Sequence, residues 1–144
     1  MKTHQILASL LFIGLFSFNS FSIELTDIEC RTMVVENDME TQSIGPFAVG
    51  QYPGSDELAF VYPANTFPQY PELEGKSLFV QVGKDQFNDN KIVVAFQVSE
   101  VGPRGEDLIQ LISSSSASLS IGNSLISYAS VFGLFNLSIQ CDLI

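Results

Sequence analysis

The chain has 144 residues with six basic and sixteen acidic side chains, which give a formal net charge of −10. An electrostatic field of this sign repels nucleic acid and favours a protein or other cationic partner, so nucleic-acid binding is excluded. The length allows one domain with a hydrophobic core but not comfortably two.

The first 22 residues have the organisation of an export signal peptide. Lys2 precedes an apolar run from Ile6 to Phe18, and Ser20 and Ser22 form a small-x-small cleavage site. The run of about 13 residues is shorter than the roughly 20 that a membrane-spanning helix needs. We therefore predict a signal peptide over residues 1–22, a single domain over residues 23–144 without a transmembrane segment, and a secreted or periplasmic location.

Cleavage removes His4, the only histidine, and leaves a net charge of −11, from five basic and sixteen acidic residues. Without an imidazole the mature chain has no Ser-His or Cys-His couple and no histidine-ligated metal. The sequence also lacks a glycine-rich phosphate-binding loop. We therefore expect no cofactor, and carboxylates are the only groups left for catalysis.

Apolar and polar residues alternate with a period of two through most of the mature sequence, which is typical of β-strands. The predicted strands cover residues 23–35, 47–50, 57–62, 77–82, 91–99, 108–112, 118–121, 124–132 and 134–142. Gly122-Asn123 and Gly133 are expected to form turns, and residues 113–116, all serine, a solvated connection. The predicted fold is all-β: an antiparallel β-sandwich or a closed barrel of about eight to nine strands.

Two cysteines, Cys30 and Cys141, lie near the two ends of the mature chain. Cys30 has the same strand parity as Ile28, and Cys141 the same as Ile139, so both can point into the core if the first and last strands lie together. In an oxidising compartment such a pair favours a disulfide bond that ties the terminal strands to each other.

Aromatic residues and prolines gather between Pro46 and Pro71, where five of the six prolines and three of the four tyrosines lie. Proline fixes its own φ and pushes the preceding residue towards extended conformations, so rings beside it are presented at a low entropic cost. Two interpretations are open: the rings anchor a partner, or, as we favour, the segment is an ordered loop whose rings pack on the core. The residues predicted to bind in the first case are Tyr52, Tyr62, Phe67 and Tyr70.

The segment between Lys84 and Lys91 is rich in oxygen ligands. Calcium prefers six to eight oxygens, whereas Asp and Asn also form turns by bonding their own backbone. The candidate calcium ligands are Asp85, Asn88, Asp89 and Asn90. A turn without a metal is the favoured alternative, because the spacing matches no established calcium-binding loop.

Three functional hypotheses remain. The first is a non-catalytic binding protein that uses the aromatic segment and the acidic surface to bind a protein or other cationic partner. The second is a carboxylate-dependent hydrolase acting on an extracellular polymer, with Glu72 or Glu74 as the catalytic candidate. The third is a subunit of a surface assembly. The apolar run from Ile92 to Phe96 is typical of a strand covered on both faces, and a neighbour can complete it by strand addition. The oligomeric state stays open.

Overall fold

The computed structural model describes residues 24–37, 39–41, 49–51 and 57–144. The predicted signal peptide and Tyr52 lie outside these residues. The strands are β1 (Ile28–Glu36), β2 (Met39–Thr41), β3 (Val49–Gln51), β4 (Glu57–Tyr62), β5 (Lys76–Asp85), β6 (Asn88–Val101), β7 (Asp107–Ser118), β8 (Leu125–Val131) and β9 (Phe135–Leu143). The helices in these ranges are the three-residue 3-10 turns η1 (Leu25–Asp27) and η2 (Pro71–Leu73), and neither has the length to cross a membrane.

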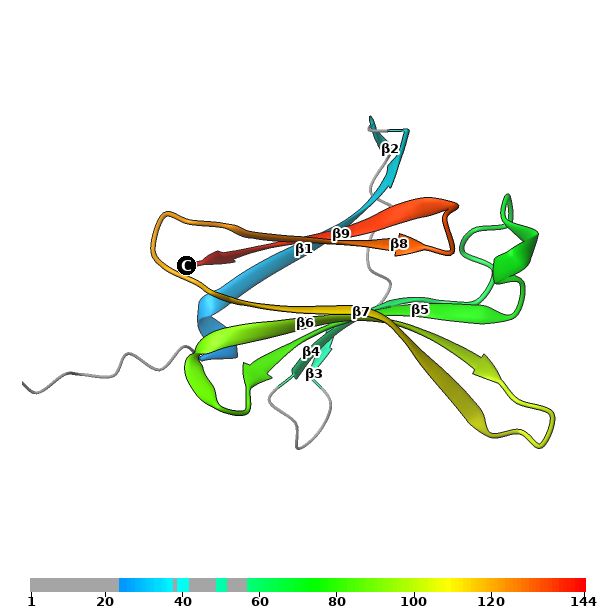
Figure 1. The fold of residues 1–144 in the computed structure, drawn as a ribbon, viewed down its shortest axis with the longest axis horizontal. Coiled ribbons are helices and arrows are strands. Elements are labelled where there is room, and N and C mark those ends of the chain that lie inside the picture. Colours follow the sequence, from blue (N-terminus) through cyan, green and yellow to red (C-terminus); the bar gives the residue numbers. More distant parts are fainter. Residues whose placement is uncertain (1–23, 38, 42–48, 52–56) are drawn as a thin grey trace, which may run out of the picture.

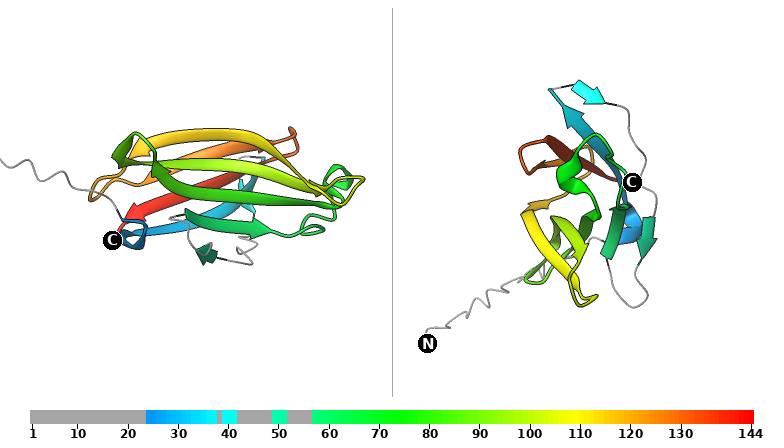
Figure 2. Two further views of the ribbon diagram at one scale, coloured as in Figure 1. Left: turned by 90° about the horizontal axis from the view of Figure 1, so that it is seen from below. Right: turned by 90° about the vertical axis from the view of Figure 1, so that its right-hand side faces the viewer.

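The strands form two antiparallel sheets that face each other (Figure 1). Among the described residues, sheet A has the order β2-β1-β9-β8 and sheet B has the order β3-β4-β5-β6-β7. The left view of Figure 2 shows the strands of sheet B side by side. The predicted all-β antiparallel fold is confirmed. The predicted count of eight to nine strands is too high, since seven strands here have six or more residues and β2 and β3 have only three each.

The closed-barrel alternative is wrong. Within the residues that the structure describes, β7 and β8 are the outermost strands of their sheets and no backbone ladder joins them. The chain passes from β7 to β8 through residues 119–124, and the side chains of Ser115 and Ser127 share a hydrogen bond of 2.8 Å. The open edge of sheet B at β7 therefore lies beside the open edge of sheet A at β8, without the continuous backbone ladder that would close a barrel.

The serine tract belongs to a strand, although the sequence predicted a connection. Strand β6 is 14 residues long and pairs along the whole tract, with Phe96 opposite Ser113 and Lys91 opposite Ser118. Because this ladder satisfies the serine backbone groups, the small polar side chains are tolerated in the strand. The predicted strand over residues 108–112 thus extends through the serine tract to Ser118 as β7, with an irregularity in register opposite Phe96 and Gln97. The separate strand predicted over residues 118–121 is wrong, since β7 ends at Ser118 and Ser120 forms only an isolated bridge with Asn123.

The hydrophobic core lies between the two sheets. In β6, the inward residues Ile92, Val94 and Phe96 have no exposed surface. Val93 and Ala95 point outward and are half-buried. The apolar run of β6 is therefore fully covered on the face towards sheet A, while its outer face stays partly open to solvent.

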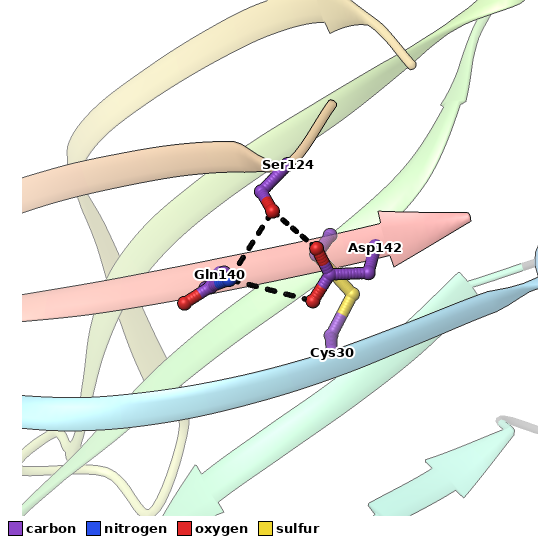
Figure 3. The surroundings of a disulfide bond; sticks show 5 residues. Cys30, Ser124, Gln140 and Asp142 are labelled. Atoms are coloured by element: carbon purple, nitrogen blue, oxygen red, sulfur yellow. Dashed lines mark hydrogen bonds between the residues drawn. A yellow bond between two sulfur atoms is a disulfide. The ribbon is translucent and has the colours of Figure 1, made fainter. Parts of the chain in front are cut away.

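The predicted disulfide between Cys30 and Cys141 is confirmed (Figure 3). The two residues lie directly opposite each other in the ladder between β1 and β9, with Cα atoms 4.1 Å apart. Cys141 is fully buried, and the half-buried Cys30 packs against the core. Ser124, before β8, donates a hydrogen bond to Asp142 and accepts one of 3.2 Å from Gln140. Sheet A is thus tied across its three longest strands.

Candidate functional site

Residues 62–71, the described end of the aromatic and proline segment, pack against both sheets. Tyr62, at the end of β4, is fully buried, and Phe67 is 4% exposed. The ring centroid of Phe67 lies 5.7 Å from that of Tyr62 and 4.9 Å from that of Phe135 in β9. The ring of Tyr70 lies 5.0 Å from that of Phe135. These positions favour the interpretation that Tyr62 and Phe67 pack on the core.

The hydroxyl groups of both described tyrosines in this segment are hydrogen-bonded within the molecule. Tyr62 shares a hydrogen bond with Thr32 of β1, and burial raises the pKa of the Tyr62 hydroxyl more than this bond lowers it. Tyr70 donates a 2.6 Å hydrogen bond to Glu36 Oε1, and this bond to the carboxylate raises the pKa of Tyr70. Of the three described binding candidates, Tyr70 alone is partly exposed.

The candidate calcium ligands flank the turn between β5 and β6: Asp85 is the last residue of β5, and Asn88, Asp89 and Asn90 are the first three of β6. Asp85 Oδ1 accepts a 2.8 Å hydrogen bond from the backbone N–H of Phe87, and Asn88 Oδ1 accepts a 3.0 Å bond from that of Asn90. These are the backbone contacts expected of a turn. The side chain of Asp89 is outside the described part of the structure. No group of three or more acidic, histidine or cysteine side chains able to hold a metal occurs among the described residues.

A hollow of about 340 Å³ lies on the outer face of sheet B, next to this turn. Glu57 of β4 lies over Gly83, where an added Cβ atom would come within 3.2 Å of Glu57 Cγ. Asp85 also lines the hollow, as does Phe87, whose side chain is 96% exposed. Two carboxylates and an exposed ring therefore border one open hollow. The sequence analysis did not find it, because Glu57 and Asp85 come together only through the pairing of β4 with β5.

Glu72 and Glu74, the catalytic candidates predicted from the sequence, do not line this hollow. Glu72 is in η2 and Glu74 follows it, and both are exposed. Glu74 lines a second hollow of about 340 Å³ together with Tyr70 and Pro71, and none of the other residues that line it is acidic. Two carboxylates, Glu57 and Asp85, therefore line the first hollow, whereas Glu74 is the single carboxylate that lines the second.

Strands β7 and β8 carry no charged side chain after Asp107, the first residue of β7. Between Asp107 and Asp142 the sequence contains no acidic, basic or histidine residue. We call residues 108–132 the uncharged side. Of the ten large hydrophobic side chains that are exposed in the described residues, seven lie here: Leu108, Ile109, Leu111, Ile121, Ile126, Tyr128 and Phe132. Absence of charge together with exposed apolar groups is typical of an interaction surface.

Strand β7 contributes three of the exposed apolar side chains of the uncharged side. Leu108 is 43% exposed, Ile109 66% and Leu111 56%. The tip of the β6–β7 hairpin turns away from sheet A (Figure 1). β7 pairs with β6 on one side, and among the described strands no ladder covers its other side. The long interval without charged residues could have pointed to this exposed edge in the sequence. Alternation of apolar and polar residues predicts a strand here but does not show that one edge of the strand is uncovered.

Comparison of the chain with protein-family models, with curated proteins and with solved structures found no match. Function is therefore inferred from the arrangement of the residues themselves.

Proposed function

We propose that the chain is an exported, non-catalytic interaction protein that binds through the open edge of β7. One observation carries the proposal: among the described strands β7 ends sheet B with an unpaired backbone edge, and Ile109 and Leu111 on this strand are more than half exposed. Such an edge takes up a further strand readily, because the added backbone satisfies its free N–H and C=O groups.

Export is supported by the leader-like sequence over residues 1–22 and by the disulfide bond, since disulfides persist in oxidising compartments. A secreted or periplasmic location is part of the proposal. The proposed contact surface is β7 and not the aromatic segment predicted from the sequence, because Tyr62 and Phe67 are buried. The acidic surface outside the uncharged side repels anionic partners, so the proposed partner offers a strand without negative charge.

The test compares Ile109→Lys with Ile144→Lys. Lysine on an edge strand opposes pairing with another strand, whereas Ile144 is 76% exposed at the chain end and lies in no strand. The full chain is expressed with its leader, recovered from the exported fraction and used to capture partners from an extract of exported proteins. Ile109→Lys should lose at least nine tenths of the specific capture at an unchanged melting temperature, and Ile144→Lys should keep it. Equal capture by both variants contradicts the proposal, as does a wild type that binds neither another protein nor itself.

A hydrolase is the second candidate, favoured by the hollow that Glu57 and Asp85 share. Glycoside hydrolysis uses two carboxyl groups roughly 5 to 10 Å apart. If the hollow is catalytic, the wild type releases reducing ends from an extracellular polysaccharide, and Glu57→Gln and Asp85→Asn each abolish the release. Glu72→Gln is the matched control and should remain active. A wild type without activity on a panel of neutral and cationic polysaccharides eliminates this candidate.

A further inference from the structure

We propose that the strand that β7 accepts is β7 of a second copy of the chain, paired antiparallel about a two-fold axis at Gln110. This inference rests on the proposed function, since it names the occupant of the same edge. Two copies of the five-stranded sheet B then join edge to edge into one continuous sheet. Such a contact is isologous, so it closes on itself as a dimer.

The available part of the edge is the first half of β7. Towards the end of the strand, Ser115 is hydrogen-bonded to Ser127 of β8, which occupies that part of the corner. Towards the start, the segment from Leu108 to Ile112 belongs to the hairpin that turns away from sheet A (Figure 1). Among the described residues, backbone pairing of this segment is with β6 alone. A second strand can therefore approach the segment along its free edge.

The sequence of this segment is self-complementary. It reads Leu108-Ile109-Gln110-Leu111-Ile112, so a two-fold axis at Gln110 places Leu108 opposite Ile112 and Ile109 opposite Leu111. Each apolar side chain meets an apolar side chain, and the amide of Gln110 meets its own copy. Ile109, Gln110 and Leu111 pair with β6 in one unbroken register, so here the opposed side chains share a sheet face and the backbone groups that face the edge on one copy meet those on the other. Ile112 lies at the register shift opposite Phe96 and Gln97 and packs against the core, so the regular ladder between the copies covers Ile109 to Leu111.

Neighbouring registers are worse. An axis at Ile109 places the carboxylate of Asp107 opposite Leu111, and an axis at Leu111 places Ile109 opposite Ser113. Cross-strand pairs of unlike polarity lose the side-chain contact that stabilises a sheet. The axis at Gln110 is therefore the register that matches the side chains best.

Charge also selects this edge for self-association. Two mature copies, each with a net charge of −11 from five basic and sixteen acidic residues, repel each other unless the contact excludes charge. In the proposed register the two copies of Asp107 are six residues apart along the paired strands, about 20 Å. This separation is about twice the screening length of roughly 8 to 10 Å at physiological salt. The remainder of the segment holds no charge, so repulsion at the interface is small.

The register is tested by cysteine cross-linking of the full chain, expressed with its leader and recovered from the exported fraction. Gln110→Cys places the two new sulfurs at the axis, where directly opposed residues have Cα atoms about 4.5 to 5.5 Å apart. Ser114→Cys is the matched control: it lies on the same exposed strand, but its two copies are eight residues apart in this register, about 26 Å. After mild oxidation, Gln110→Cys should migrate as a covalent dimer without reductant, and Ser114→Cys should remain monomeric. Equal cross-linking of both variants overturns the register.

Sedimentation velocity of the wild type and of Ile109→Lys tests the dimer itself. The wild type should sediment as a dimer whose fraction rises with concentration, and Ile109→Lys should sediment as a monomer with an unchanged melting temperature. A wild type that stays monomeric overturns the inference, and if it still captures another protein through Ile109, the proposed function survives. A dimer that Ile109→Lys does not weaken places self-association on another surface and overturns the inference as well.

Discussion

Replacing Tyr62 with phenylalanine is expected to lower the free energy of unfolding by about 1 to 3 kcal/mol. Tyr62 ends β4 in sheet B and Thr32 lies in β1 of sheet A, so their hydrogen bond joins the two sheets through the core. Both side chains are buried, and Thr32 is only 2% exposed. Phenylalanine keeps the ring but leaves the Thr32 hydroxyl buried without a partner, and the cost of that unpaired group sets the magnitude.

A double-mutant cycle separates the hydrogen bond from the loss of packing. Thr32→Val alone leaves the Tyr62 hydroxyl unpaired and should cost a similar amount. The double variant removes both polar groups and should cost less than the sum of the single changes. Urea unfolding measures the free energies, and the melting temperature should fall by about 4 °C per kcal/mol for a domain of this size. Single changes within about 0.5 kcal/mol of the wild type, or strictly additive ones, would refute the reasoning.

Three further outcomes are expected. Above pH 10, the ordinary pKa of tyrosine, the free energy of unfolding should fall as pH rises, because burial raises the pKa of Tyr62 and the folded state holds the proton more tightly. Below that pH the Tyr62 hydroxyl is protonated in both states, and its contribution to the free energy of unfolding is fully present. The urea midpoint, measured between about pH 8 and 11, should therefore fall less with rising pH for Tyr62→Phe than for the wild type. Tyr70→Phe should cost about 0.5 to 1.5 kcal/mol in urea unfolding, since it removes the hydrogen bond to Glu36. Replacing Cys30 and Cys141 together with alanine should cost about 4 to 5 kcal/mol, because the bond spans 111 residues of sequence.

Each of these outcomes has a contrary result. A pH profile of Tyr62→Phe identical to that of the wild type above pH 10 means that the hydroxyl ionises equally in both states. An unchanged urea midpoint for Tyr70→Phe means that the bond to Glu36 adds no stability. A double alanine variant at Cys30 and Cys141 as stable as the wild type shows that pairing of β1 with β9 does not need the covalent link.

Several parts of the fold follow from local rules and were predictable. Alternation along β9 placed Cys141 on the core face, and the parity of Cys30 agreed with it. The reversal at Gly133 has a φ of 73°, a conformation that glycine adopts without strain. The turn at Gly122 likewise has a φ of 83°, and Asn123 N–H bonds Ser120 O at 3.0 Å. Each of these features depends only on residues close in the sequence.

The failures all depend on what a residue meets in space. The serine tract reads as a connection by composition, and it is a strand because β6 supplies a partner for its backbone. The burial of Tyr62 and Phe67 agrees with the favoured interpretation of the aromatic segment as a loop packed on the core, but the sequence did not identify Phe135 of sheet A as the ring that packs against Phe67. The hollow at Glu57 arises from the pairing of distant strands. Sequence periodicity identifies a strand and its faces, but it does not identify the neighbour.

The pairing of β1 with β9 also fixes the order in which the chain can fold. Sheet B builds from strands that follow one another, β4 to β7, so its hairpins can form while synthesis continues. The main partner of β1 is β9, and Cys30 must wait for Cys141, 111 residues later. Sheet A is therefore completed only after β9 has been synthesised, and a contact of such long sequence separation is expected to slow folding.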